Sequence, residues 1–206
     1  MSIKAIFFIL VVTIVGGRSF GQEFSLEETR NLAEQGNLAA QLILGTMYLQ
    51  GIDVPRNPSE ALKWIELAAE QGEATAQGTV GALYEYGEIG IPQNPTEAVK
   101  WYLLAAEQGN ANAQFRLSVM YAGNGVPQNN SEAVRFLKLA ANHGLAEAQW
   151  NLGYRYYKGL DMPQNHTEAF RWYRMAALQG DSTARITFHD SIDQSIAHFE
   201  FPILSH

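Results

Sequence analysis

The stretch "VPRNPSEALKWIELAAEQG" (residues 54–72) decides the fold, because the chain repeats it three more times. The further copies are "IPQNPTEAVKWYLLAAEQG" (91–109), "VPQNNSEAVRFLKLAANHG" (126–144) and "MPQNHTEAFRWYRMAALQG" (162–180). Successive closing glycines, counted from Gly36 to Gly180, are 35 to 37 residues apart. Self-similarity at this period is typical of repeat architectures and not of a single catalytic motif.

A second recurring element precedes each copy. It reads "AAQLILGTMY" (39–48), "TAQGTVGALY" (75–84), "NAQFRLSVMY" (112–121) and "EAQWNLGYRY" (147–156). An alanine, a leucine or valine, a small residue and a tyrosine recur at i, i+4, i+5 and i+8, which is the spacing of one helix face. Each unit is therefore predicted to contain two helices, which we call helix A and helix B, joined by a turn.

The turn and the end of each unit carry helix-terminating signals. Asn57, Pro58 and Glu60 fit the N-cap, N1 and N3 positions of helix B, with the glutamate reaching back as in a capping box. The same pattern begins at Asn94, Asn129 and Asn165. The closing glycines are predicted to adopt the left-handed conformation that ends helix B. The small residues of helix A predict a close approach of helices, and they are Gly45, Gly81, Ser118 and Gly153.

One such unit buries too little apolar surface to be stable alone, whereas stacked units share a continuous core. The predicted fold is all-α, a solenoid of four full repeats with terminal half-repeat caps. The predicted repeats span 37–72, 73–109, 110–144 and 145–180, after an N-terminal capping helix in 22–36. Residues 181–206 are predicted to hold a C-terminal capping helix, with His189 at the small-residue position, and a tail.

The repeated pattern resembles that of the Sel1-like repeats, relatives of the tetratricopeptide repeat with a longer loop between the helices. "AQxxLGxxYxxGxxVPxNxxEAxxWxxxAAxQG" is nearly literal in 41–72 and in 149–180, and the middle units differ by one loop residue. The resemblance implies a right-handed α/α superhelix that acts as an interaction scaffold, with helix A lining the concave surface.

The N-terminus has the features of a secretory signal peptide. Lys4 precedes the eleven-residue apolar run "AIFFILVVTIV" (5–15), and "SFG" supplies small residues for cleavage after Gly21. The run is short for a membrane-spanning helix, although an uncleaved anchor is the alternative. We therefore expect a periplasmic or secreted protein without membrane insertion after cleavage. The absence of cysteine fits an oxidising compartment but excludes a disulfide framework.

Loss of residues 1–21 removes two basic side chains and no acidic one, so 12 basic and 21 acidic side chains leave a net charge of −9. This charge argues against nucleic-acid binding and suits a basic partner.

The candidate binding residues are those of helix A that lie off the packing face. Trp150, Tyr154 and Tyr157 stand at i, i+4 and i+7, roughly 160° around the helix from Leu152. Matching upstream positions include Leu42, Gly78 and Phe115. Large aromatics flanked by arginines are typical of binding hot spots. The predicted partner-binding set is Phe115, Arg116, Trp150, Asn151, Tyr154, Arg155 and Tyr157.

An alternative is that the apolar tail, with Phe199, Phe201 and Leu204, folds back over these aromatics. The tail's histidines and acids match no standard metal-ligand spacing, so no metal or other cofactor is predicted. The sequons at 129–131 and 165–167 coincide with helix caps.

The main hypothesis is a non-catalytic exported scaffold that binds a protein or peptide in its groove. Resemblance to short exported Sel1-like proteins makes it a candidate immunity or inhibitor protein for a toxin such as a secreted phospholipase. The alternative is a cell-envelope enzyme acting on β-lactams or peptidoglycan-like substrates. No nucleophile with a base and an orienting partner is evident, and the family members tied to β-lactams are cysteine-rich.

Overall fold

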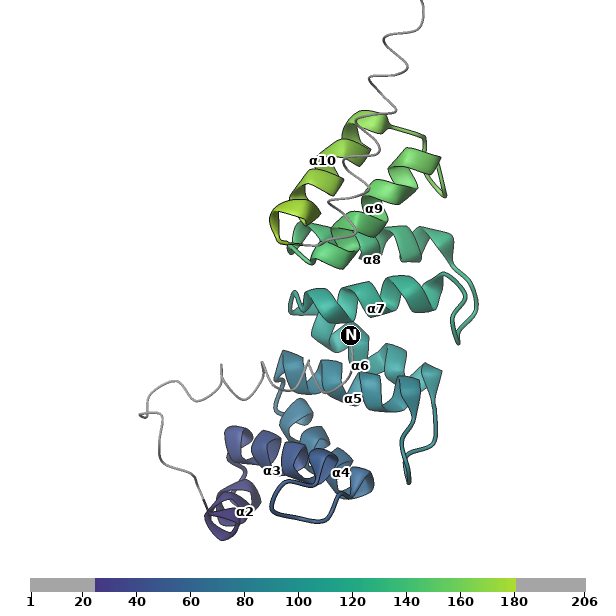
Figure 1. Cartoon of the computed structure of the whole chain (residues 1–206). Helices are drawn as coiled ribbons and strands as arrows, with labels where there is room; N and C mark the ends of the chain where they lie inside the picture. Colours follow the sequence, from purple (N-terminus) through teal and green to yellow (C-terminus); the bar gives the residue numbers. More distant parts are fainter. Residues whose placement is uncertain (1–24, 181–206) are drawn as a thin grey trace, which may run out of the picture. The chain divides into compact units, whose positions relative to one another are not determined.

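The computed structural model describes residues 25–180, which contain nine α-helices and no β-strand (Figure 1). The predicted signal peptide (1–21) and the predicted C-terminal cap and tail (181–206) lie outside the described residues. The helices are α2 (Leu26–Glu34), α3 (Leu38–Gln50), α4 (Pro58–Glu70), α5 (Ala74–Tyr86), α6 (Pro95–Glu107), α7 (Ala111–Tyr121), α8 (Asn130–Asn142), α9 (Ala146–Lys158) and α10 (His166–Leu178). The predicted all-α fold of paired helices is confirmed.

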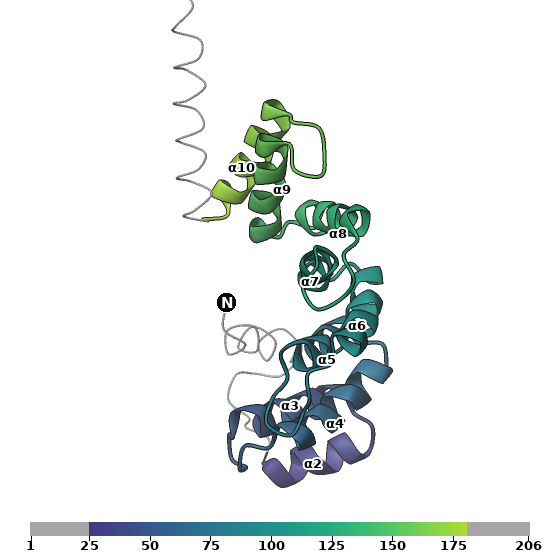
Figure 2. The ribbon, with the colours of Figure 1, turned by 90° about the vertical axis from the view of Figure 1, so that its right-hand side faces the viewer.

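The helices form two compact units, which within the described chain are residues 25–113 (unit 1) and 114–180 (unit 2). In unit 1, α3 packs against α4 and α5 against α6, and in unit 2, α9 packs against α10 (Figure 2). In each of these repeats, helix A is the first helix and helix B the second. Among residues 25–180, no helix is long and apolar enough to span a bilayer.

The predicted asparagine caps are present in all four repeats. The Asn57 side chain accepts a hydrogen bond from the Glu60 backbone N–H, and the asparagines at 94, 129 and 165 cap their helices in the same way. The closing glycines have φ between 83° and 91°, which confirms that helix B ends in the left-handed conformation.

The second half of the predicted capping box is not formed. The Asn57 N–H donates instead to the Tyr48 carbonyl at 2.8 Å, so the donor that a glutamate would satisfy is already used. Glu60 instead forms an ion pair with Lys63 at 2.8 Å. In the other three repeats, the asparagine N–H likewise donates to a tyrosine carbonyl of helix A, and the glutamate likewise forms an ion pair three residues along helix B. The cap residue thus fastens the start of helix B to the end of helix A.

Buried glutamines link successive helices. Gln77 of α5, 5% exposed, donates to the Ala69 carbonyl at the end of α4 at 3.2 Å. Its side-chain oxygen accepts a 2.8 Å bond from Gln108 at the end of α6. Gln41 and Gln149 make the same pair of bonds in their repeats. One glutamine side chain therefore donates to a carbonyl at the end of one helix B and accepts a bond from the end of the next helix B. These two hydrogen bonds compensate the cost of burying its polar atoms.

The small residues of helix A lie where helix B approaches most closely. A Cβ atom placed on Gly81 would lie 2.7 Å from Cδ1 of Tyr102, and one on Gly153 would lie 2.8 Å from Cδ1 of Tyr173. Gly45 stands in the same relation to Ile65. The predicted close approach is confirmed at these three positions. At the fourth position helix A has Ser118 in place of glycine, and the matching helix B residue is Leu137.

Helix α5 offers a matched test of this contact. Gly81→Ala should lower the free energy of unfolding by about 1–3 kcal/mol, because Tyr102 must move from its packed position. Gly78→Ala, three residues earlier in the same helix, would meet only Asn110 Nδ2 at 3.7 Å. That variant should be neutral or more stable by up to about 1 kcal/mol, from helix propensity. Urea unfolding followed by circular dichroism measures both, and equal changes would contradict the packing argument.

Candidate partner-binding site

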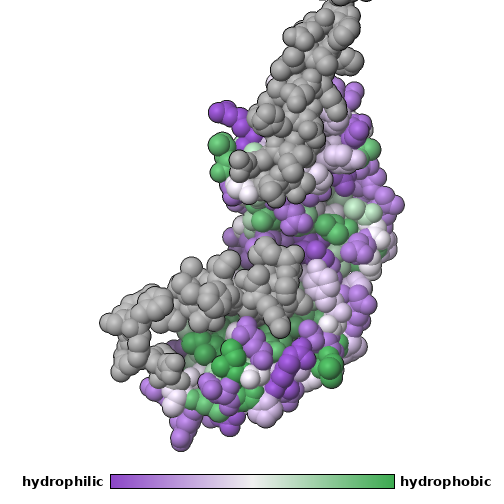
Figure 3. Space-filling model, in the orientation of Figure 1, coloured by the Kyte–Doolittle hydropathy of each residue, from purple (hydrophilic) through white to green (hydrophobic). Residues whose placement is uncertain are grey.

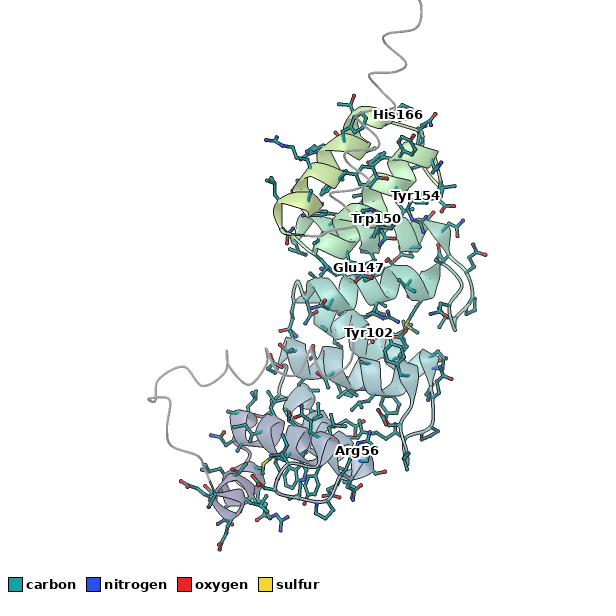
Figure 4. The ribbon with its side chains drawn as sticks, viewed as in Figure 1. Arg56, Tyr102, Glu147, Trp150, Tyr154 and His166 are labelled. Atoms are coloured by element: carbon teal, nitrogen blue, oxygen red, sulfur yellow. The ribbon has the colours of Figure 1, made fainter. Side chains whose placement is uncertain are left out.

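The predicted binding residues lie on two helices of unit 2. Phe115 and Arg116 belong to α7, and the other five belong to α9. Figure 4 shows Trp150 and Tyr154 together on α9. Some of the predicted binding residues are buried in the core, and others are exposed to solvent or half-buried.

Phe115 lies in the core. Its side chain is 8% exposed and belongs to a buried cluster with Leu137 of α8, Leu152 of α9 and Trp172 of α10. The candidate surface is therefore narrower than the sequence indicates.

The residues at the matching positions in the first repeat are buried as well. Leu42 and Leu49 are 3% and 8% exposed, in a buried cluster that includes Val80 of the following helix A. The physical reason is that, within each unit, helix A of the following repeat contributes to the buried cluster on this side: Val80 of α5 in unit 1 and Leu152 of α9 in unit 2. The corresponding residues of the last repeat, Trp150 and Tyr157, are only half-buried, and the described chain ends at Gly180 before any further helix A. We call Trp150 and Tyr157 the end face of α9.

A separate row of α9 residues takes no part in this packing. Glu147, Asn151, Tyr154 and Lys158 recur at i, i+4, i+7 and i+11, and all are exposed or half-buried. We call these four residues the open stripe of α9. Tyr154, 38% exposed, is its one large aromatic side chain.

Aromatic contacts fix the side chains of both surfaces. The rings of Trp150 and Tyr154 stack nearly parallel, with centroids 5.8 Å apart. Tyr157 meets the His166 ring edge-on at 5.2 Å, and the Lys158 ammonium lies 5.2 Å from the Tyr157 centroid. Because these rings are held in place, a partner would lose little side-chain entropy on binding them.

The three predicted polar residues, Arg116, Asn151 and Arg155, all make contacts within the protein. Arg155 forms an ion pair with Asp161, whose other oxygen accepts a 2.7 Å bond from Asn130 of α8. Arg155 is thus part of a link between the last two repeats. Asn151 donates to the Glu147 carbonyl at 2.8 Å, and Arg116 is half-buried with contacts of its own.

Charge is distributed unevenly between the units. Residues 25–113 carry 12 acidic and 4 basic side chains, a net charge of −8. Residues 114–180 carry 4 acidic and 7 basic side chains, a net charge of +3. The candidate surface therefore lies in a basic unit of an acidic chain, a feature that the whole-chain charge conceals.

A buried hydroxyl lies within the last repeat. Tyr173 is fully buried and its hydroxyl has no hydrogen-bond partner. Burial, followed by the nearby Tyr157 and Tyr154, raises the pKa of Tyr173 to about 12. The matching residue Tyr102 donates a 2.8 Å bond to the buried Glu85 carboxylate. Tyr157 stands at the Glu85 position in the last repeat, so that acceptor is absent there.

Other large hydrophobic side chains also reach the surface. Figure 3 shows hydrophobic and hydrophilic residues beside one another on both units. Ile52, Ile89 and Leu160 lie in the loops between helix A and helix B and are 48%, 80% and 45% exposed. Scattered residues of this kind are normal. Within residues 25–180, no group of three or more histidine or acidic side chains is placed to hold a metal ion.

The comparisons with known proteins agree with this architecture. The model of the Sel1 repeat matches residues 38–73, 74–110, 111–145 and 146–181. A Sel1 repeat protein from Oxalobacter formigenes is 36% identical, with a TM-score of 0.73 over 81% of this chain and 70% of its own. A protective antigen of uropathogenic Escherichia coli with an SLR fold is 35% identical, with a TM-score of 0.71 over 80% of this chain. This chain spans 35% of the length of that antigen.

More distant structures share the fold alone. An immunity protein from Pseudomonas aeruginosa is 21% identical, with a TM-score of 0.51 over 88% of this chain and 67% of its own. A second immunity protein of that organism is 19% identical, with a TM-score of 0.51 over 87% of this chain and 66% of its own. No curated protein gives a significant match.

Paired helices with a shared core, joined through capped turns, define a helical-repeat scaffold of the kind that mediates protein–protein interaction. The repeats are those of one family throughout. The chain belongs to the Sel1 repeat family.

Two matched variants test the buried hydroxyls. Tyr102→Phe should lower the free energy of unfolding by about 1–3 kcal/mol, because the buried Glu85 carboxylate loses a donor. Tyr173→Phe should leave it unchanged or raise it, because it removes an unpaired polar atom. The two variants should therefore separate in urea unfolding at neutral pH.

Tyr173→Phe should also change the response of the protein to alkaline pH. A folded-state pKa of about 12, above the ordinary value of 10.0, favours the neutral phenol in the folded protein, so stability falls as pH rises from 10 towards 12. Tyr173→Phe should lose less stability over this range than the unsubstituted chain. An identical decline in both would contradict the assignment of the raised pKa to Tyr173.

Proposed function

We propose that this protein is an exported, non-catalytic scaffold that binds a protein partner through the open stripe of α9. The observation that carries the proposal is Tyr154, a large aromatic residue 38% exposed on a helix whose opposite side is fixed in the core. An exposed tyrosine that is held in place by stacking on a neighbouring tryptophan is a favourable hot spot.

The charge distribution indicates the chemistry of the partner. The open stripe begins at Glu147 and ends at Lys158, in a unit with a net charge of +3, so the partner segment that meets its Lys158 end carries acidic groups. The basic partner region suggested by the whole-chain charge would instead meet unit 1, with its net charge of −8. Such a partner has surfaces of both signs.

A more specific proposal is that the partner is a toxin, for instance a secreted phospholipase, and that this protein is its immunity protein. Support comes from the fold shared with the two Pseudomonas aeruginosa immunity proteins and from the expected export of the chain. An inhibitor of this kind needs a rigid, charged binding surface and no catalytic group.

The test is capture of partners from the native envelope and secreted fractions, with identification by mass spectrometry and titration of the purified partner. Tyr154→Ala combined with Lys158→Ala should weaken binding by about 30-fold or more, as expected for loss of a hot spot. Helix content should stay unchanged, because both side chains lie off the core. For a toxin partner, the unsubstituted protein should also abolish its activity in proportion to the amount added.

The matched control is Lys138→Ala combined with Arg174→Ala, two exposed residues of helices α8 and α10. This variant should bind as the unsubstituted protein does. Equal affinity of the stripe variant and the control would remove α9 from the binding site. Hydrolysis of a β-lactam or a peptidoglycan fragment that depends on one residue would overturn the non-catalytic assignment.

A further inference from the structure

The outer surface of unit 1 carries the same three side chains on each of its two B helices. A lysine, a leucine and a glutamate recur at i, i+4 and i+7, a spacing that places them on one helix face. All are exposed. They are Lys63, Leu67 and Glu70 in α4, and Lys100, Leu104 and Glu107 in α6. We call these six residues the outer face of unit 1.

The two helices lie side by side and run in the same direction. At their C-terminal ends, Gln77 donates to the Ala69 carbonyl of α4 and accepts a bond from Gln108, which follows α6. At the start of α4, the Ser59 hydroxyl donates a 3.1 Å bond to the carbonyl of Gly90, in the loop that leads into α6. The lysine, leucine and glutamate of α4 therefore lie next to those of α6, in the same order.

The leucines form the apolar centre of this face. Leu67 is 43% exposed and Leu104 is 45% exposed. Each stands two residues after a fully buried residue of its helix, about 200° around the helix axis, so it points away from the core. Exposed leucines at matching positions of neighbouring helices indicate an interaction surface.

The order of the charges makes the outer face complementary to itself. In both helices the lysine lies towards the N-terminus, the glutamate towards the C-terminus, and the leucine between them. When a second copy lies antiparallel on this face, every lysine meets a glutamate and every leucine meets its own equivalent. This is the symmetric arrangement of an isologous two-fold interface.

The lysines can bind a second carboxylate. Lys63 forms its ion pair with Glu60 at 2.8 Å, yet its side chain is 69% exposed. Lys100 pairs with Glu97 at the same distance and is 65% exposed. Because an ammonium group has three donors, the bond within the helix leaves donors for a glutamate of another molecule.

Unit 2 lacks this self-complementary pattern. The residues at the matching positions are basic at the start of each helix B, and neither helix has an acidic residue at the end. They are Arg135, Leu139 and Asn142 in α8, and Arg171, Met175 and Leu178 in α10. The arrangement is therefore specific to unit 1, and unit 2 supplies a matched control.

The size of the face indicates a weak association. Two neighbouring helices of 13 residues present a surface of roughly 20 by 20 Å, so a face-to-face pair buries on the order of 1,000 Å² in total. This area is at the lower end for specific interfaces. The outer face has two basic and two acidic side chains, so the net charge of −8 resides on other residues of unit 1. Their repulsion is screened over about 8 Å at physiological salt.

We propose that two copies of this chain associate through the outer face of unit 1, with α4 antiparallel to α4 of the second copy. Lys63 then pairs with Glu70 of the second copy, Leu67 packs on its equivalent, and α6 contributes the same contacts. The proposal does not depend on the proposed function, because the open stripe of α9 belongs to unit 2.

Sedimentation velocity of the complete purified chain tests the proposal, over concentrations from about 1 μM to about 500 μM. The fraction of dimer should rise with concentration. Lys63→Glu combined with Lys100→Glu should weaken the association by about tenfold or more, because like charges then face each other. Glu70→Lys combined with Glu107→Lys should weaken it equally. An equimolar mixture of the two variants should recover the dimer, because every facing pair is again of opposite charge.

The matched control is Arg135→Glu combined with Arg171→Glu, at the lysine position in unit 2. It breaks the same kind of ion pair and makes the same change in net charge, two substitutions of −2 each. It should leave the association unchanged. Circular dichroism should show the same helix content for every variant, because all the substituted side chains are exposed.

A chain that stays monomeric at every concentration would overturn the proposal, including where another protein needs Lys63 and Lys100 for binding. A dimer that the control variant weakens as much as the lysine variant would also contradict it, as would a mixture of variants that stays monomeric. Tyr154→Ala combined with Lys158→Ala should leave the dimer intact, so this proposal and the proposed function fail separately.

Discussion

The contact between the small residue of helix A and the large residue of helix B determines the geometry of each repeat. At Gly81 and Gly153 a single added carbon would overlap a tyrosine ring, and at Gly45 it would overlap an isoleucine. In these three repeats the two helices therefore approach to a distance that only glycine permits, whereas the remaining repeat has Ser118 at this position. This close packing lets helices of 13 residues share a core, although neither could bury enough surface alone.

Polar groups hold this packing in register. The asparagine at each turn accepts a bond from helix B and donates one to the last turn of helix A, so a loop of about seven residues has both ends fastened. The buried glutamines perform the equivalent function between helix B and the next helix A. Each bond satisfies a carbonyl or amide that a helix end would otherwise leave unpaired in the interior.

Periodicity and cap chemistry were sufficient to predict the helices, their ends and the small-residue contact, because these features depend on neighbours within one repeat. The glutamine network was missed, although its recurrence in every unit was a visible signal. Of the predicted capping box, the asparagine cap was right and the reciprocal bond from the glutamate was wrong. The asparagine N–H donates to a carbonyl of another helix, which a local pattern cannot reveal. The predicted aromatic binding residues include both buried and exposed side chains, for a similar reason. Periodicity separates the faces of a helix, but it does not tell which face the next repeat covers, and Phe115 lies on a covered one.

This distinction between covered and open faces also explains how one fold can serve for both stability and recognition. Residues between repeats must fit their neighbours, so Leu42 and Phe115 are constrained by packing. Residues of the open stripe lie outside the buried cluster of their repeat, so aromatic and charged side chains can be placed there at little structural cost. The uneven charge has the same origin, because a surface that no repeat covers can be acidic in one unit and basic in the other. Specificity for a partner can therefore reside in Tyr154 and Lys158 without disturbing the contacts that hold α9 against α10.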